Sequence, residues 1–271
     1  MGKIIPLISP NIQENDIECV ANVLRSGMLV QGRYVKELED AIAFYTKSTY
    51  ASAVSNGTAS LHLALLTLGI GKDDEVILPA LSYIATANVI ELVGAKCVFV
   101  DVNIDTFNID ENKIESVITD RTKAIIPVHE FGLCANMLKI MKIAVRHNLF
   151  VIEDAACAIG ATINNKHAGT FGHFGSFSFH PRKSITSGEG GCLITNDFES
   201  DKKIKVLRNH GIEPNSNPLN FVAAGYNYRM TDFQAALLLS QFPRLDNIIR
   251  YKSKLAEIYL SEIKHASVKL P

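Results

Sequence analysis

Three short segments of the chain carry side chains whose types and spacing could do chemistry. The first is Ser55-Asn56-Gly57-Thr58-Ala59-Ser60, which lies between an expected strand and an expected helix. Small residues let a backbone approach a ligand closely, and the first amides of a helix bind anions together with a nearby hydroxyl. An ordinary helix cap at Ser55 or Thr58 is the structural alternative.

The second and third segments add a carboxylate and an amine. Glu153-Asp154-Ala155-Ala156 directly follows an apolar strand, and α/β proteins bind ligands at the carboxyl ends of such strands. A salt-bridged or capping Asp154 is the alternative. Lys183 lies in the run from Phe177 to Gly191, among Ser, Thr and glycine residues. A lone lysine is usually a solvated surface charge, but a lysine in a confined loop can lose its proton and form a Schiff base.

An anion site, an aspartate and a confined lysine together form the set that pyridoxal 5'-phosphate requires. The phosphate would lie at the helix start. Asp154 would pair with the pyridinium nitrogen and keep the ring an electron sink. Lys183 would carry the cofactor and, once released, would move protons.

The elements that must position these groups alternate between strand and helix. Short β-branched runs alternate with amphipathic stretches, which is typical of βαβ units and a largely parallel sheet. The continuous apolar run at Phe150-Val151-Ile152 favours a strand covered on both faces. We expect strands at 50–55, 75–79, 96–101, 122–128, 149–154, 174–179 and 190–195, and helices at 15–26, 35–46, 58–68, 83–93, 136–146, 231–241 and 245–263.

Composition excludes several classes of protein. The 271 residues are 47% hydrophobic and 20% charged, which suits a sizeable core and excludes disorder, collagen and a coiled coil. The 27 basic and 28 acidic residues give no basic field for nucleic acid or for a membrane surface. No apolar run reaches the roughly 18 residues of a membrane span, and no signal-peptide core is present. Five scattered cysteines predict neither disulfides nor a metal site, so we expect a cytoplasmic protein.

Further motifs occur in a fixed order along almost the whole chain, and together they resemble the DegT/DnrJ/EryC1/StrS family of sugar aminotransferases. The resemblance implies the aspartate-aminotransferase type of fold (fold type I), an α/β fold with a mostly parallel, seven-stranded type of sheet between helices. The motifs are Pro6 with Ser26-Gly27 and Gln31-Gly32, Ser55 to Ala59, Val128-His129 with Gly132, Glu153 to Ala156, Phe177 to Gly191, Leu207-Arg208 with His210-Gly211, and Gly225 to Met230 leading to Gln234-Ala235-Ala236.

The resemblance also implies roles for single residues. By position, Lys183 resembles the Schiff-base lysine and Asp154 the partner of the pyridine nitrogen. Cys157 stands where the family usually has Gln or His near the phenolic oxygen of the ring, and a thiol is a weaker donor. Tyr83 resembles the aromatic residue stacked on the ring. The residues that resemble phosphate ligands are Gly57, Thr58, the Ala59 amide and Ser178.

Asn227 resembles the residue that reaches the phosphate from a neighbouring subunit, which implies a homodimer with shared active sites. Family members continue by about a hundred residues past the end of this chain. We therefore interpret residues 1–243 as the cofactor-binding large domain. We interpret residues 244–271 as a connecting helix toward a C-terminal small domain that is missing or truncated.

The implied activity is pyridoxal-phosphate-dependent transfer of an amino group, with glutamate as donor, to a nucleotide-linked keto-sugar. The amino-sugar would serve surface polysaccharide or secondary-metabolite biosynthesis. In the family's dehydratases a His replaces the lysine, so Lys183 favours transamination. Two alternatives stay open: a truncated, non-catalytic cofactor-binding or regulatory homologue, and a different pyridoxal-phosphate reaction such as dehydration or a lyase step.

Overall fold

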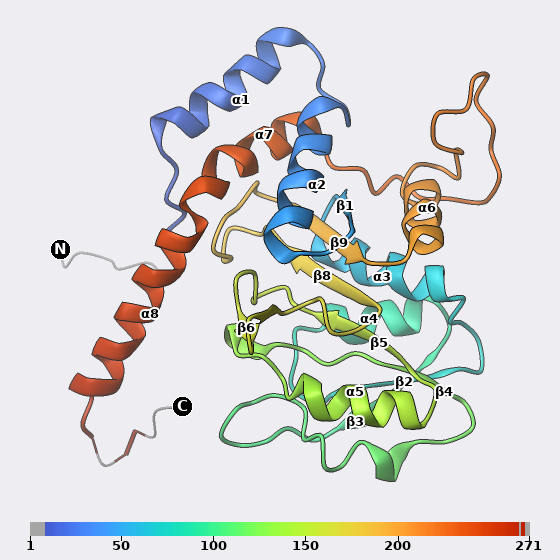
Figure 1. Cartoon of the computed structure of the whole chain (residues 1–271), viewed down its shortest axis with the longest axis vertical. Helices are drawn as coiled ribbons and strands as arrows, with labels where there is room; N and C mark the ends of the chain where they lie inside the picture. Colours follow the sequence, from blue (N-terminus) through green and yellow to red (C-terminus); the bar gives the residue numbers. More distant parts are fainter. Residues whose placement is uncertain (1–8, 266, 269–271) are drawn as a thin grey trace.

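The chain forms one seven-stranded sheet with helices on both faces (Figure 1). The structure is a computed structural model that describes residues 9–265 and 267–268; the motif residue Pro6 lies outside them, as do residues 266 and 269–271 of the expected connecting segment. The strand order is β1-β9-β8-β5-β4-β2-β3. Strand β9 runs antiparallel to β1 and β8, and the other neighbouring pairs are parallel. The prediction of a mostly parallel seven-stranded sheet between helices is therefore confirmed.

The elements have the following bounds. The sheet strands are β1 Tyr50–Val54, β2 Glu75–Pro79, β3 Lys96–Val100, β4 Thr122–Ile125, β5 Phe150–Asp154, β8 Phe174–Ser178 and β9 Gly191–Thr195, and a small hairpin consists of β6 Thr162–Ile163 and β7 Lys166–His167. The α-helices are α1 Glu14–Ser26, α2 Arg33–Thr46, α3 Gly57–Leu68, α4 Ala85–Leu92, α5 Met137–Arg146, α6 Phe198–Leu207, α7 Asp232–Gln241 and α8 Leu245–Glu262, with 3-10 turns at Glu115–Val117, Glu130–Gly132 and Phe242–Arg244.

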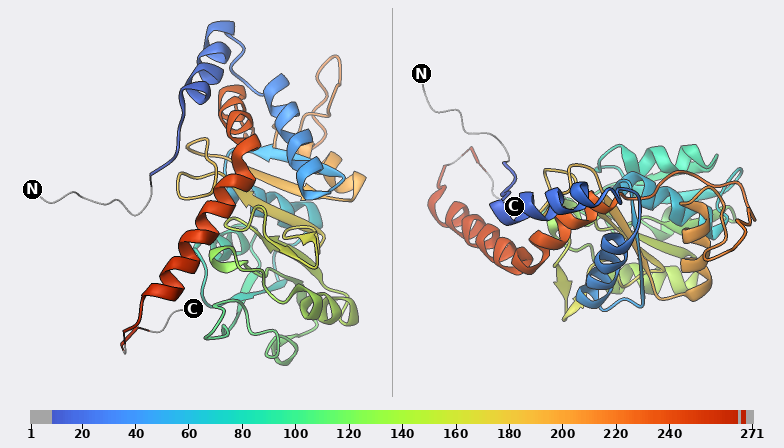
Figure 2. Two further views of the ribbon diagram at one scale, coloured as in Figure 1. Left: turned by 60° about the vertical axis from the view of Figure 1, so that its left-hand side comes forward. Right: turned by 90° about the horizontal axis from the view of Figure 1, so that it is seen from above.

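The core lies on both faces of this sheet. Helices α3, α4 and α6 pack against one face, where Ile152 of β5 and Phe174 of β8 are buried. On the other face α5 covers β2, β4 and β5, while α2 and α7 cover β1, β8 and β9; Figure 2 shows these layers from two further sides. Because both faces are covered, β2, β8 and β9 are buried along nearly their whole length instead of alternating between buried and exposed residues, and so is β5 after Phe150.

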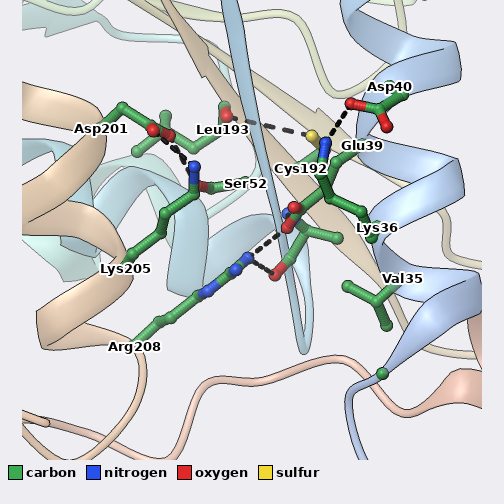
Figure 3. A network of polar contacts seen from close by, with 12 residues as sticks. Val35, Lys36, Glu39, Asp40, Ser52, Cys192, Leu193, Asp201, Lys205 and Arg208 are labelled. Carbon is green, nitrogen blue, oxygen red and sulfur yellow. Dashed lines mark hydrogen bonds and ion pairs between the residues drawn. The ribbon is translucent and has the colours of Figure 1, made fainter. Parts of the chain in front are cut away.

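A buried ion pair joins two helices to the edge strand β1 (Figure 3). Arg208 follows the last turn of α6, and its Nη1 lies 2.5 Å from Oε1 of Glu39 on α2. The same Nη1 donates to the Ala53 carbonyl at 2.7 Å, and the Ala53 amide donates to Glu39 at 2.9 Å. A second pair lies beside it, in which Asp201 accepts from Lys205 at 2.5 Å and from Ser52 at 3.1 Å. These contacts fix α2 and α6 relative to the strand that leads into α3.

Some elements differ from the sequence-based expectation. Helix α6 and the β6–β7 hairpin were not predicted. The strand expected at 122–128 ends at Ile125, and the helix expected from Tyr83 begins at Ala85. Within α8, Leu245 is the one buried residue. None of the helices in the described residues is long and apolar enough to cross a membrane.

Candidate active site

A cavity of about 590 Å³ lies where β5 and β8 end and α3 begins. This is the carboxyl edge of the parallel strands, where α/β proteins bind ligands. All the predicted site residues line it except Cys157 and Asn227. Its lining includes Asn56, Gly57, Thr58, Ala59, His62, Tyr83, Asp154, Ala156, Ser178, His180, Arg182, Lys183, Glu189 and Tyr228.

The turn from β1 into α3 forms one wall of the cavity. The helix cap is Asn56, neither Ser55 nor Thr58, because Asn56 Oδ1 accepts a hydrogen bond from the Ala59 amide at 2.8 Å. The Ala59 amide, which was expected to bind phosphate, therefore already has a partner. The first helical amides, those of Gly57 and Thr58, have no acceptor within the helix, so they are the ones available to an anion.

Close packing holds this turn against the sheet. A Cβ atom at Gly57 would lie 3.0 Å from the Cβ of Ser178, at the end of β8. A Cβ atom at Gly191 would lie 2.4 Å from the carbonyl carbon of Asn56, a distance that real Cβ atoms do not show. Glycine at these two positions therefore lets the turn lie directly on β8 and β9, with the helix amides and the Ser178 hydroxyl on the cavity wall.

Asp154, the last residue of β5, supplies a buried carboxylate to the cavity. Its Oδ2 accepts a hydrogen bond from Thr86 Oγ1 at 2.8 Å, and its Oδ1 accepts one from the Ala156 amide at 3.2 Å. Burial raises the pKa of Asp154, and these hydrogen bonds partly oppose the rise. Such a carboxylate suits a ligand group that brings its own proton, as a pyridinium nitrogen does.

The neighbouring Glu153 points to the other face of the sheet and holds the adjoining loops. It accepts hydrogen bonds from His129 Nε2 at 2.9 Å and from the backbone amides of residues 169, 171 and 172 at 2.6 to 2.8 Å. His129 Nδ1 accepts from the Ala135 amide, so its proton is on Nε2. Glu153 thus anchors the adjoining loops, whereas Asp154 faces the cavity.

Lys183 lies on the cavity wall and forms no ion pair with a carboxylate within the described residues. Its Nζ donates to the sulfur of Cys157 at 2.9 Å. A second amine lies close by, because Lys252 on α8 donates to the hydroxyl of Ser184 at 3.4 Å. Partial burial lowers the pKa of Lys252. The structure therefore brings the predicted lysine and Cys157 together, with Cys157 contacting the lysine side chain.

The residues present fit pyridoxal phosphate. Open helix amides and two hydroxyls, those of Thr58 and Ser178, lie on one wall of the cavity. A buried carboxylate at Asp154 and an amine at Lys183 lie on its other walls, and the largely exposed ring of Tyr83 lies at its rim. Asn227 does not line this cavity, and its reach into a neighbouring subunit stays a prediction.

Three lining or supporting residues were missed from the sequence. Thr86 is the second residue of α4 and donates to Asp154. His62 Nδ1 lies 3.1 Å from the Tyr228 hydroxyl, and burial lowers the pKa of His62. His62 follows Thr58 by four residues, a spacing that places both on one helix face, so it was within reach of sequence analysis. Glu130 lies near Asp154 and Lys183, and burial raises its pKa.

Comparison with known proteins agrees with this geometry. The model of the DegT/DnrJ/EryC1/StrS aminotransferase family matches residues 10–271. The chain is 44% identical over 254 residues to a GDP-perosamine synthase of Caulobacter vibrioides, covering 94% of this chain and 67% of the relative. It is 40% identical to a UDP-4-amino-4-deoxy-L-arabinose--oxoglutarate aminotransferase of Shewanella sediminis, covering 95% and 69%.

Two solved structures are also similar to this chain. The aminotransferase from Psychrobacter cryohalolentis superposes with a TM-score of 0.90 at 35% identity, covering 93% of this chain and 68% of that one. NtdA from Bacillus subtilis, solved with bound cofactor PMP, has a TM-score of 0.84 at 36% identity, covering 92% and 58%. The chain thus spans about two thirds of the length of most of these proteins.

Proposed function

Since the chain belongs to the DegT/DnrJ/EryC1/StrS aminotransferase family, we propose that it transfers an amino group from an amino acid to a nucleotide-linked keto-sugar with pyridoxal phosphate as cofactor. The observation that carries the proposal is the convergence of Lys183, Asp154 and the open start of α3 on one cavity. No observation favours the non-catalytic homologue, because each group that the cofactor needs is present.

Each wall of the cavity has a part in the proposed reaction. The amides of Gly57 and Thr58 and the Ser178 hydroxyl bind the phosphate of the cofactor. Asp154 holds the proton at the pyridine nitrogen. When bound, pyridoxal phosphate supplies the electron sink that stabilises charge at the α-carbon of the donor. Lys183 Nζ would hold the cofactor and, once released from it, would move the proton taken from that α-carbon.

The names of the relatives suggest the substrate to test first. GDP-perosamine synthases at 44% and 41% identity favour a GDP-linked sugar, and the relative at 40% is named for a UDP-linked one. Glutamate is the proposed donor, and an amino-sugar for polysaccharide or secondary metabolism the proposed product. The free cysteines suit a reducing compartment such as the cytoplasm.

We extend the proposal to the assembly. Asn227 lies outside the cavity of its own chain, which suits a homodimer in which it reaches the phosphate in its partner. Helix α8 buries only Leu245, which suits a connecting helix beyond a cofactor-binding unit at residues 1–243.

The test is covalent capture of the cofactor on Lys183. Pyridoxal phosphate added to the wild-type chain should give a visible band that borohydride removes, leaving a pyridoxyl mass on the peptide containing Lys183. Lys183→Ala should lose both. Lys252→Ala is the matched control, because it removes the neighbouring amine and should keep both. A pyridoxyl group on the Lys183→Ala chain, with its far-ultraviolet circular dichroism unchanged, would sink the assignment.

A further inference from the structure

Arg182 is the arginine whose side chain has no polar partner in the part of the chain that the structure describes. It directly precedes Lys183 and lines the same cavity. Its one hydrogen bond is from its backbone amide to His180 Nδ1 at 3.3 Å. The other arginines each have a polar side-chain partner: Arg25, Arg33, Arg121, Arg146, Arg208 and Arg244 an acid, and Arg229 and Arg250 an asparagine.

Acids line the same cavity but do not pair with this guanidinium. Asp154 is held by Thr86 and Ala156, and Glu189 lies on the wall without forming an ion pair to Arg182. Arg182 is exposed, so water solvates its charge in the free chain, and its guanidinium stays available to an anion that enters the cavity. The backbone that carries it is fixed, because the Lys183 amide donates to the His180 carbonyl at 2.8 Å.

A guanidinium presents paired N–H donors that match the oxygens of a carboxylate or phosphate. The start of α3, on the Thr58 side of the cavity, is available for the phosphate of the cofactor. The identity of the substrates rests on the proposed function. Those substrates carry further oxyanions. These are the carboxylates of the amino-acid donor and the diphosphate of the sugar nucleotide.

We propose that Arg182 binds an oxyanion of the incoming substrate and so anchors that substrate beside Lys183. Because Arg182 and Lys183 line the same cavity, such a contact would make Arg182 a specificity-determining residue for the reaction. Substrate would be held at two points: by Arg182 through its charged group and by Lys183 at the reacting centre.

The test is binding of two unreactive probes to the 271-residue, cofactor-free chain by isothermal titration calorimetry. Glutarate reports on the donor carboxylates, and GDP reports on the nucleotide phosphates. Arg182→Gln should weaken at least one of them by about tenfold or more, since it removes a charge-assisted hydrogen bond. Arg182→Lys keeps the charge but loses the paired N–H donors of the guanidinium. It should therefore weaken binding by an intermediate amount. Arg250→Gln is the matched control, because that exposed arginine on α8 bonds only to Asn247.

A loss confined to glutarate would assign the carboxylate, and a loss confined to GDP would assign the phosphate. In steady-state assays of holoenzyme, the KM of the corresponding substrate should rise while kcat changes little. The proposal is overturned if the wild type binds neither probe, if Arg182→Gln binds both like the wild type, or if Arg250→Gln loses as much. None of these titrations needs cofactor chemistry, so their failure is distinguishable from failure of Lys183 to capture pyridoxal phosphate.

Discussion

Two regions of this molecule differ in how their charged side chains are partnered. Beside β1, the Glu39 carboxylate meets the Arg208 guanidinium and a backbone amide, so each charge has an opposite partner. In the cavity, the Asp154 carboxylate accepts only from a hydroxyl and an amide, and Arg182 has no side-chain partner. In the first region, the paired charges hold α2 and α6 together. The second keeps the exposed Arg182 and the buried Asp154 available to a ligand, and a bound ligand would offset the cost of burying Asp154 without a charged side-chain partner.

The difference follows from where each group lies along the chain. The paired charges are on helix flanks and can meet across β1. The cavity charges lie at strand ends: Asp154 is the last residue of β5, and Arg182 follows β8 by four residues. Sheet topology therefore helps to decide which charges are structural and which face a ligand.

The largest effect that this comparison predicts is on folding, at the paired region. Arg208→Ala should lower the free energy of unfolding by about 3–5 kcal/mol, because it leaves the Glu39 carboxylate buried without a charged partner. Urea unfolding followed by circular dichroism measures it. The double variant Glu39→Gln with Arg208→Met should lose markedly less. A single variant as stable as the wild type would mean that the pair contributes nothing and that the contrast between the regions is false.

At Asp154, by contrast, removing the carboxylate should raise the free energy of unfolding. Burial raises its folded pKa, so the stability that this group contributes is full below the ordinary Asp pKa and is lost as pH rises through the folded pKa. The cofactor-free Asp154→Asn chain should therefore become increasingly more stable than the wild type as pH rises above the ordinary Asp range. The same variant should bind pyridoxal phosphate more weakly.

Asp201→Asn is the matched control for that prediction. Asp201 is equally buried but pairs with Lys205, so its loss should destabilise the chain at neutral pH. Denaturant unfolding of both variants across a pH series measures whether Asp154→Asn stabilises the chain and Asp201→Asn destabilises it. An Asp154→Asn chain that is less stable than the wild type at every pH would show that the cavity carboxylate is structural.

The sequence could predict much of the sheet and most of the cavity wall because both depend on local pattern. Apolar strands followed by Gly57-Thr58, Asp154 or Ser178 place those residues at one edge whenever the strands are parallel. The order of the strands and the packing between distant elements are not local. Thr86 reaches Asp154 only because α4 packs near the end of β5, a contact between residues 68 positions apart.

Helix α6 escaped prediction for a related reason. Its sequence is half charged, and what holds it in place is burial of Ile204 and Leu207 and the Arg208 contact across β1. The cap at Asp197 and the acidic first turn were local signals that could have found it. The cap at Asn56 was missed because three neighbouring residues could each cap α3, and only the backbone geometry decides among them.

The smallest predicted effect separates the two kinds of helix start. Asn56 caps α3 at the cavity, and Asp197 caps α6 away from it through the Ser200 amide at 2.7 Å. Asn56→Ala and Asp197→Ala should each cost about 1 kcal/mol of stability, because each leaves one helix amide without its cap. Only Asn56→Ala should also change the affinity for pyridoxal phosphate, since it frees the Ala59 amide beside the amides of Gly57 and Thr58 that face the ligand. Thermal unfolding of both variants measures the loss of stability, and titration with pyridoxal phosphate measures the change in affinity. Equal changes in cofactor affinity would show that the start of α3 binds no phosphate, and that the cavity differs from the rest of the surface only through Lys183 and Asp154.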